Sequence, residues 1–212
     1  LEETDAAPKP IQVVPQGIPV ERFPVKAHPG RLSVPLKLLY AGRLHPDKGV
    51  HTLLEAIPEV EAHGVAVECT VVGDGRRDYR QRLDWLARQC RATVSFTDWV
   101  PRDDVSRLLR EHDVLVFPSI WEEPFGLAHL EAMASGTVVV STDRGGCAEL
   151  VRHGDNALRF EAGDAADLAA QIRRLVAEPD LAAGLAQRAR REVETDYDVC
   201  RYAEALLAAA LR

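Results

Sequence analysis

From Leu36 onward, short apolar runs alternate with longer segments in which apolar residues recur every three or four positions. The short runs are rich in β-branched residues and are typical of strands buried on both faces, whereas the longer segments are typical of amphipathic helices. The pattern predicts six strands, at residues 36–40, 66–72, 93–96, 114–117, 137–141 and 157–160. It predicts helices at residues 50–63, 76–91, 102–111, 125–135 and 148–152 (a single turn), followed by 165–177, 181–194 and 199–211.

Strands that are almost wholly apolar and are separated by crossover helices predict a parallel sheet covered by helices on both faces. Crossovers of this kind are right-handed, so the predicted fold class is α/β, a Rossmann-like doubly wound parallel sheet of about six strands. In such sheets, ligands bind beyond the carboxyl ends of the strands. We therefore expect the functional residues in the loops that follow the strands.

The organisation predicted along the chain has three parts. Residues 1–35 hold seven of the 13 prolines and predict a linker or extended arm, with one short strand at residues 11–14. Residues 36–196 form the predicted Rossmann-like domain, and residues 197–212 form a final helix.

Composition excludes several classes of function. The formal net charge of −7 gives no broad basic surface for nucleic acid. No apolar run approaches the roughly 20 residues that span a membrane, and the acidic N-terminus, which lacks an initiator Met, is not a signal peptide. The missing initiator Met is consistent with a piece of a longer protein, either cut or natural. The four scattered cysteines predict a reduced, cytoplasmic chain, and we expect no metal site, because the seven histidines show no ligand spacing.

The most informative segment carries Glu123 and Glu131, with seven residues between them, after one predicted strand and into the next predicted helix. The start of that helix leaves backbone N–H groups unpaired at Phe125, Gly126 and Leu127, which can hold a phosphate. Glu131 lies about 7 to 8 Å further along the helix axis, where its carboxylate can bind the hydroxyls of a ribose. Glu123 lies on the other side of the phosphate position, where a second sugar would sit. The segment therefore predicts a site for a sugar–diphosphate–nucleoside.

The other loops at the same predicted edge add further candidates. Arg43 and Lys48, on the loop after the first strand, carry the charge to neutralise a diphosphate, or they serve only a solvated, helix-capping loop. Gly73 after the second strand allows close backbone approach to a ligand or simply forms a turn. Val100 after the third strand offers a backbone edge to a planar base, although the neighbouring Pro101 also favours simple helix initiation.

Two alternatives to the sugar-nucleotide interpretation concern the glutamates themselves. Glu123 and Glu131 could be solvated acids that favour a helix start. They could also be the carboxylate pair of a hydrolase, but this reading explains neither the cations nor the parallel sheet.

Taken together, these residues resemble the C-terminal, donor-binding domain of the retaining glycosyltransferases of family four (glycosyl transferases group 1), which have the two-domain GT-B fold. The resemblance covers residues 11–212 and rests on an ordered set of motifs. These are Gly42-Arg43-Leu44 with Asp47-Lys48-Gly49, Val72-Gly73-Asp74-Gly75, Trp99-Val100-Pro101, Pro118-Ser119 with Glu123-Pro124-Phe125-Gly126-Leu127 and Glu131-Ala132, and Gly145-Gly146 with Glu149.

The resemblance implies a role for each matching residue. Arg43 and Lys48 would hold the donor diphosphate and stabilise the leaving group, and Glu123 would contact the transferred sugar; these three are the implied catalytic residues. The implied donor-binding residues are Gly42, Gly73, Val100 (through its backbone), Phe125, Gly126, Leu127 and Glu131 (on the ribose). The implied reaction transfers a sugar from a nucleotide donor to an acceptor with retention of configuration and without a metal cofactor.

The N-terminal acceptor domain of the family is missing from this chain. The resemblance therefore implies a donor-binding half that is weakly active or inactive alone, with the final helix packing toward the missing domain. The parent enzyme would be cytoplasmic, at the inner membrane face where its acceptor is lipid-linked. A non-catalytic nucleotide-binding or regulatory module of the same fold, and a nucleotide-sugar epimerase, are the alternative functions.

Overall fold

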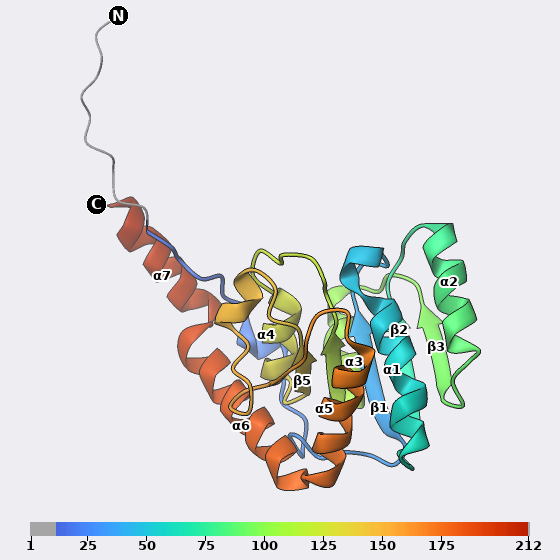
Figure 1. The fold of residues 1–212 in the computed structure, drawn as a ribbon. Coiled ribbons are helices and arrows are strands. Elements are labelled where there is room, and N and C mark those ends of the chain that lie inside the picture. The colour runs from blue at the N-terminus through green and yellow to red at the C-terminus, as the bar shows by residue number, and fades with distance from the viewer. Residues whose placement is uncertain (1–11, 212) are drawn as a thin grey trace, which may run out of the picture.

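The computed structural model describes residues 12–211 and contains one six-stranded parallel sheet with the strand order β3-β2-β1-β4-β5-β6. The strands are β1 (Leu36–Ala41), β2 (Val67–Val72), β3 (Thr93–Thr97), β4 (Val114–Phe117), β5 (Val138–Ser141) and β6 (Leu158–Arg159). All six of these predicted strands are present, and the order reverses between β1 and β4, as in a doubly wound sheet. Figure 1 shows β2 and β3 on one side of β1 and β5 on the other. The predicted fold class is confirmed.

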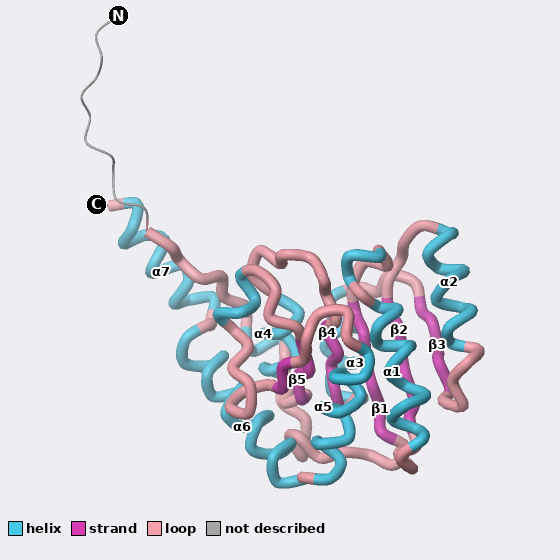
Figure 2. Tube along the Cα trace, in the orientation of Figure 1, coloured by secondary structure: helices cyan, strands magenta, loops and turns pink. Residues whose placement is uncertain are grey.

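Helices cover both faces of the sheet (Figure 2). They are α1 (Val50–Ala62), α2 (Arg77–Ala87), α3 (Arg102–Glu111), α4 (Leu127–Ala134), α5 (Ala165–Ala177), α6 (Pro179–Asp196) and α7 (Val199–Ala210). Helices α1, α2 and α5 pack on one face, α3 and α4 pack on the other, and α6 contacts both α4 and α5. The alternation along β1 explains the two layers, since Leu38 and Tyr40 enter the first core while Leu39 enters the second.

Several helices differ from the prediction at their ends; α2, predicted to residue 91, ends at Ala87, and α6, predicted at residues 181–194, spans Pro179–Asp196. For two other helices a glycine explains the difference. The helix predicted from Phe125 begins at Leu127, because Gly126 has a φ of 122°, outside the helical range. The one-turn helix predicted at residues 148–152 is a 3₁₀ turn at Gly146–Glu149, which starts directly after Gly145 with its φ of 72°.

Part of the proline-rich segment is built into the second core. Of the predicted strand at residues 11–14, Ile11 lies outside the described residues, and residues 12–14 form no strand. Further along, Ile18 and Phe23 are fully buried among residues of α4, α6 and β5. The Ile18 amide donates to the Tyr197 carbonyl, and the Val199 amide donates to the Ile18 carbonyl, each at 2.9 Å. These bonds join the proline-rich segment to the start of α7.

Helix α7 has no buried residue, and Figure 1 shows it projecting from the body of the domain. Leu206 and Leu207 are among its exposed apolar side chains. The final helix predicted from the sequence is therefore present, without a packing partner in the described chain.

Candidate functional site

A cavity of about 430 Å³ opens at the carboxyl ends of β1 and β2, beside α3 and α4. It lies where the strand order reverses at β1 and β4, the position at which doubly wound sheets bind ligands. The residues around it are largely apolar, with three charged side chains, Arg43, Asp74 and Glu131. The lining residues are Ala41, Gly42, Arg43, Val72, Gly73, Asp74, Trp99, Val100, Val105, Leu109, Leu115, Ala128 and Glu131.

The loops after β1 and β2 form one wall of the cavity and are joined through their backbones. The Gly42 amide donates to the Val72 carbonyl at 3.0 Å, and the Leu44 amide donates to the Asp74 carbonyl at 2.8 Å. Gly73 has a φ of 144°, and a Cβ at this position would lie 1.9 Å from the Gly42 carbonyl oxygen. Only glycine permits this approach, so Gly42 and Gly73 present bare backbone to the cavity.

Arg43 is exposed at the mouth of this cavity and makes no ion pair with any residue of the described range 12–211. Its carbonyl accepts a hydrogen bond from the Tyr40 hydroxyl at 2.8 Å, which fixes the loop. The guanidinium therefore offers its donors to an anion without first breaking a salt bridge.

On the opposite wall, Glu131 is the fifth residue of α4 and faces Arg102 at the start of α3. The Nε and Nη2 atoms of Arg102 donate to Oε1 of Glu131 at 3.1 and 2.8 Å. Burial raises the pKa of the Glu131 carboxyl, and the charge and hydrogen bonds of Arg102 oppose that rise.

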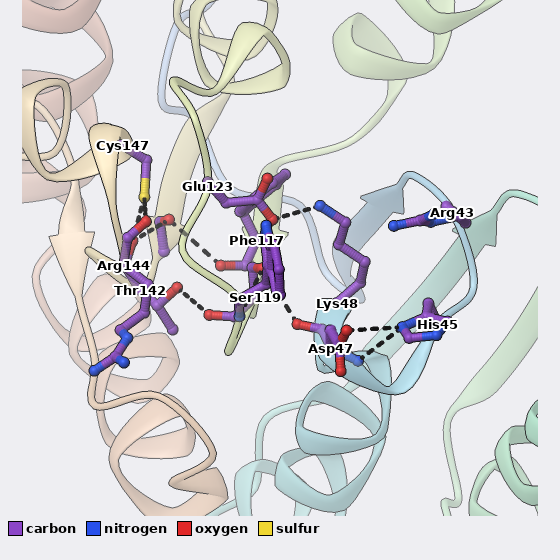
Figure 3. Close-up of polar contacts among 12 residues, drawn as sticks. Arg43, His45, Asp47, Lys48, Phe117, Ser119, Glu123, Thr142, Arg144 and Cys147 are labelled. Carbon is purple, nitrogen blue, oxygen red and sulfur yellow. Dashed lines mark hydrogen bonds and ion pairs between the residues drawn. The ribbon is translucent and has the colours of Figure 1, made fainter.

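Lys48 and Glu123 form an ion pair beside the cavity, with 2.6 Å between Nζ and Oε1. Figure 3 shows the two side chains reaching toward each other, with Arg43 beyond Lys48. Oε1 of Glu123 also accepts a hydrogen bond from the Ser119 hydroxyl at 2.5 Å. The Glu123 amide donates to the Arg144 carbonyl at 3.0 Å, so the loop after β5 fixes its backbone.

Along the chain, the start of α4 lies between Glu123 and Glu131. The amides of Phe125, Gly126 and Leu127 precede the first intrahelical hydrogen bond, and none donates to another backbone group within residues 12–211. They provide the anion-binding end of a helix.

His129, the third residue of α4, packs the start of this helix against β4 and β5. Its ring is fully buried and packs against Phe117 with ring centroids 4.4 Å apart, and its Nε2 lies 2.7 Å from the Ser141 hydroxyl. Desolvation lowers the pKa of His129 to about 4. The imidazole is therefore neutral at pH 7.

The structure brings most of the predicted site residues to one edge of the sheet. Gly42, Arg43, Gly73, Val100 and Glu131 line one cavity. Lys48 and Glu123 lie beside it but are paired with each other, and Phe125, Gly126 and Leu127 start α4.

Sequence reasoning missed Arg102 as a member of the site. A cation in the first turn of a helix, where the macrodipole disfavours positive charge, was the available signal.

No group of three or more potential metal ligands occurs within residues 12–211, and no helix there is long and apolar enough to cross a membrane.

Comparison with known proteins identifies the family. Residues 26–192 match the glycosyl transferases group 1. Glycogen synthase of Mycobacterium tuberculosis is 34% identical over 193 residues, which are 89% of this chain and 45% of that protein. The chain belongs to the glycosyl transferases group 1 family, and it spans less than half the length of this relative.

Solved structures have the same fold. The crystal structure of Anabaena Alr3699/HepE in complex with UDP-glucose has a TM-score of 0.81 and 25% identity, covering 93% of this chain and 57% of that one. The C-terminal domain of LpcC, a glycosyl transferase group 1 family protein of Francisella tularensis, has a TM-score of 0.77 and 21% identity. That match covers 86% of this chain and 100% of the LpcC domain. The chain thus has the fold of the C-terminal domain of a GT-B glycosyltransferase.

Proposed function

We propose that this chain is the donor-binding half of a retaining glycosyltransferase and binds a nucleoside-diphosphate sugar in the cavity at the ends of β1 and β2. The observation that carries the proposal is the convergence of three features on one cavity: a cation without an ion pair in residues 12–211 (Arg43), bare glycine backbone (Gly42 and Gly73) and a largely buried carboxylate (Glu131). The UDP-glucose complex of the similar HepE structure supports it.

The proposed donor spans the cavity from Val100 to the start of α4. The base meets the backbone of Val100, the ribose hydroxyls bind Glu131, and the diphosphate lies between Arg43 and the free amides of Phe125, Gly126 and Leu127. Glu123 and Lys48 lie beyond the diphosphate, where Glu123 contacts the transferred sugar and Lys48 exchanges the carboxylate for phosphate oxygens.

Two positive side chains and a helix N-terminus would stabilise the diphosphate as it departs. This part of the proposal requires no metal cofactor. Departure of the diphosphate from the face that the acceptor then attacks, with a phosphate oxygen taking the proton of the acceptor hydroxyl, gives retention of configuration. The products are the nucleoside diphosphate and the glycosylated acceptor.

The acceptor site belongs, in this proposal, to a preceding domain, against which the uncovered helix α7 packs. The isolated chain would then bind donor but transfer sugar weakly or not at all. Purified chain that transfers sugar at the rate of the two-domain enzyme would refute this part.

A cytoplasmic location, at the inner membrane face where the acceptor is lipid-linked, completes the proposal. Cell fractionation of the full-length protein tests it. Recovery outside the cytoplasmic and peripheral membrane fractions would contradict it.

Calorimetric titration of the purified chain with UDP, GDP and ADP tests donor binding. We expect one nucleoside diphosphate to bind, and Glu131→Ala to weaken it at least tenfold because the ribose hydroxyls lose their acceptor. Glu111→Ala, at an exposed glutamate at the far end of α3, is the matched control and should bind like the wild type. Equal affinities for wild type and Glu131→Ala would refute the assignment.

A further inference from the structure

Arg102 stands in a position that its own helix disfavours. It is the first residue of α3, where the helix dipole repels a cation. Its guanidinium reaches a residue 29 positions away, because both Nε and Nη2 donate to the same oxygen, Oε1 of Glu131. The tertiary contact, not helix formation, therefore accounts for an arginine at this position.

The pairing leaves the two oxygens of Glu131 with different surroundings. Oε1 accepts both hydrogen bonds from Arg102, whereas Oε2 accepts none from residues 12–211. Glu131 lines the cavity, and its side chain is 14% exposed against 44% for Arg102. The carboxylate is thus held by one oxygen and keeps the other as a free acceptor.

The proline-rich segment before β1 contacts Arg102 and the first turn of α3. The Arg102 guanidinium lies 5.5 Å from the centroid of the buried Phe23 ring, a cation–π contact. Next to it, Arg22 pairs with Asp103 at 2.8 Å, and the Ser106 hydroxyl donates to the Arg22 carbonyl at 2.9 Å. These contacts fix the first turn of α3 relative to the segment and restrict where the guanidinium can lie.

We propose that Arg102 is a positioning residue of the ribose subsite, which holds Oε1 of Glu131 so that Oε2 accepts a ribose hydroxyl. The inference rests on the proposed function, because it assigns the ribose to Glu131. It adds a second residue that selects ribose over 2′-deoxyribose without touching the reacting atoms.

No other charged group in residues 12–211 contacts Glu131. The charged or titratable side chains on neighbouring elements include Arg43, Asp74, Asp103, Asp104, Arg107, Arg110, Glu111, Glu123, His129 and Arg190. Of these, His129 on the same helix is neutral at pH 7, and Arg190 from α6 reaches the Ala134 carbonyl at the other end of α4. Loss of Arg102 should therefore raise the pKa of Glu131 further, because burial would act unopposed.

The test compares Arg102→Gln with Arg107→Gln, which removes the same charge from an exposed arginine of the same helix. The first measurement is an NMR titration of the Glu131 side-chain carbon in protein with ¹³C-labelled glutamate. We expect a higher pKa for Glu131 in Arg102→Gln and an unchanged titration in Arg107→Gln. An unchanged titration in Arg102→Gln overturns the inference, whatever the chain binds.

The second measurement is the affinity for a nucleoside diphosphate, determined by calorimetry from pH 8 to pH 5.5. The ligands are the one among UDP, GDP and ADP that binds to the wild type, and its 2′-deoxy analogue. Wild type should prefer the ribose form over this range. Arg102→Gln should bind it at least tenfold more weakly, with a loss that grows as pH falls, and should discriminate less against the 2′-deoxy form. Arg102→Lys should recover part of the affinity.

The outcomes separate the inference from the function on which it rests. If the wild type binds a nucleoside diphosphate and Arg102→Gln binds it equally at every pH, the inference is overturned and the proposed function stands. If the wild type binds none of the three, the proposed function and the ribose role both fail, even where the titration shifts.

Discussion

The Lys48–Glu123 pair predicts a measurable coupling between two distant positions. Glu123 is 8% and Lys48 19% exposed, with 2.6 Å between their charged atoms. At an effective dielectric of about 20, this separation corresponds to an attraction of about 6 kcal/mol, most of which offsets the cost of desolvating both charges. The informative quantity is therefore the penalty for removing one partner alone.

Lys48→Met leaves a buried carboxylate whose one remaining side-chain partner among residues 12–211 is the Ser119 hydroxyl. Breaking a buried pair in this way costs about 3 to 5 kcal/mol. Because Lys48 is partly exposed, we expect the free energy of unfolding to fall by about 3 kcal/mol, the lower end of this range. Glu123→Gln should cost less, because the lysine can turn to water. The double variant should be more stable than the sum of the single effects implies, by about 2 kcal/mol.

Urea unfolding of the four proteins, followed by circular dichroism, measures this coupling. The matched control is the neighbouring pair Arg144–Glu122, which has a similar distance of 2.8 Å but side chains that are 46% and 64% exposed. The cycle of Arg144→Met and Glu122→Gln should give a coupling below about 1 kcal/mol. Additive effects of Lys48→Met and Glu123→Gln, within about 0.5 kcal/mol, would refute the buried-pair reasoning.

Two further predictions concern backbone approach and acid sensitivity. Gly73→Ala should lower the free energy of unfolding by at least about 2 kcal/mol more than Gly64→Ala does. Both positions have a positive φ, but of the two only Gly73 would place a Cβ against a carbonyl oxygen. Equal urea midpoints for the two variants would contradict this. For His129, the folded-state pKa of about 4 lies below the ordinary histidine value of 6.5, so the unfolded chain binds more protons between these values and stability falls as pH drops through this window. His129→Gln should remove up to about 3 kcal/mol of this pH dependence, whereas His63→Gln, at an exposed histidine, should leave it unchanged; parallel stability–pH curves for wild type and His129→Gln would exclude the mechanism.

The strands could be predicted from the sequence because their signal is local. Each of the six strands predicted from residue 36 onward overlaps an observed one, and β4 matches residue for residue. The buried segment before β1 could not be predicted in the same way. Ile18 and Phe23 stand singly among prolines and glycines, so no periodicity marks them as core residues, and their burial depends on α4 and α6.

The site was predictable in its location but not in its pairings. The loops after parallel strands must share one edge, so the convergence of Arg43, Gly73 and Glu131 follows from the fold. The contacts of Glu123 with Lys48 and of Glu131 with Arg102 join residues 75 and 29 positions apart. Such contacts depend on how α3, α4 and the loops pack, which no spacing in the sequence records.

The joined loops after β1 and β2 have a consequence for protein engineering. Their backbones continue the pairing of the two strands beyond the sheet, from the Gly42–Val72 hydrogen bond to the bridge between Leu44 and Gly75. A side chain at Gly73 would collide with the first loop, and one at Gly75 would collide with the Leu44 carbonyl. Under the proposed function, donor preference is therefore not transplanted one loop at a time: a chimaera that exchanges residues 41–49 should also exchange residues 72–76 from the same parent.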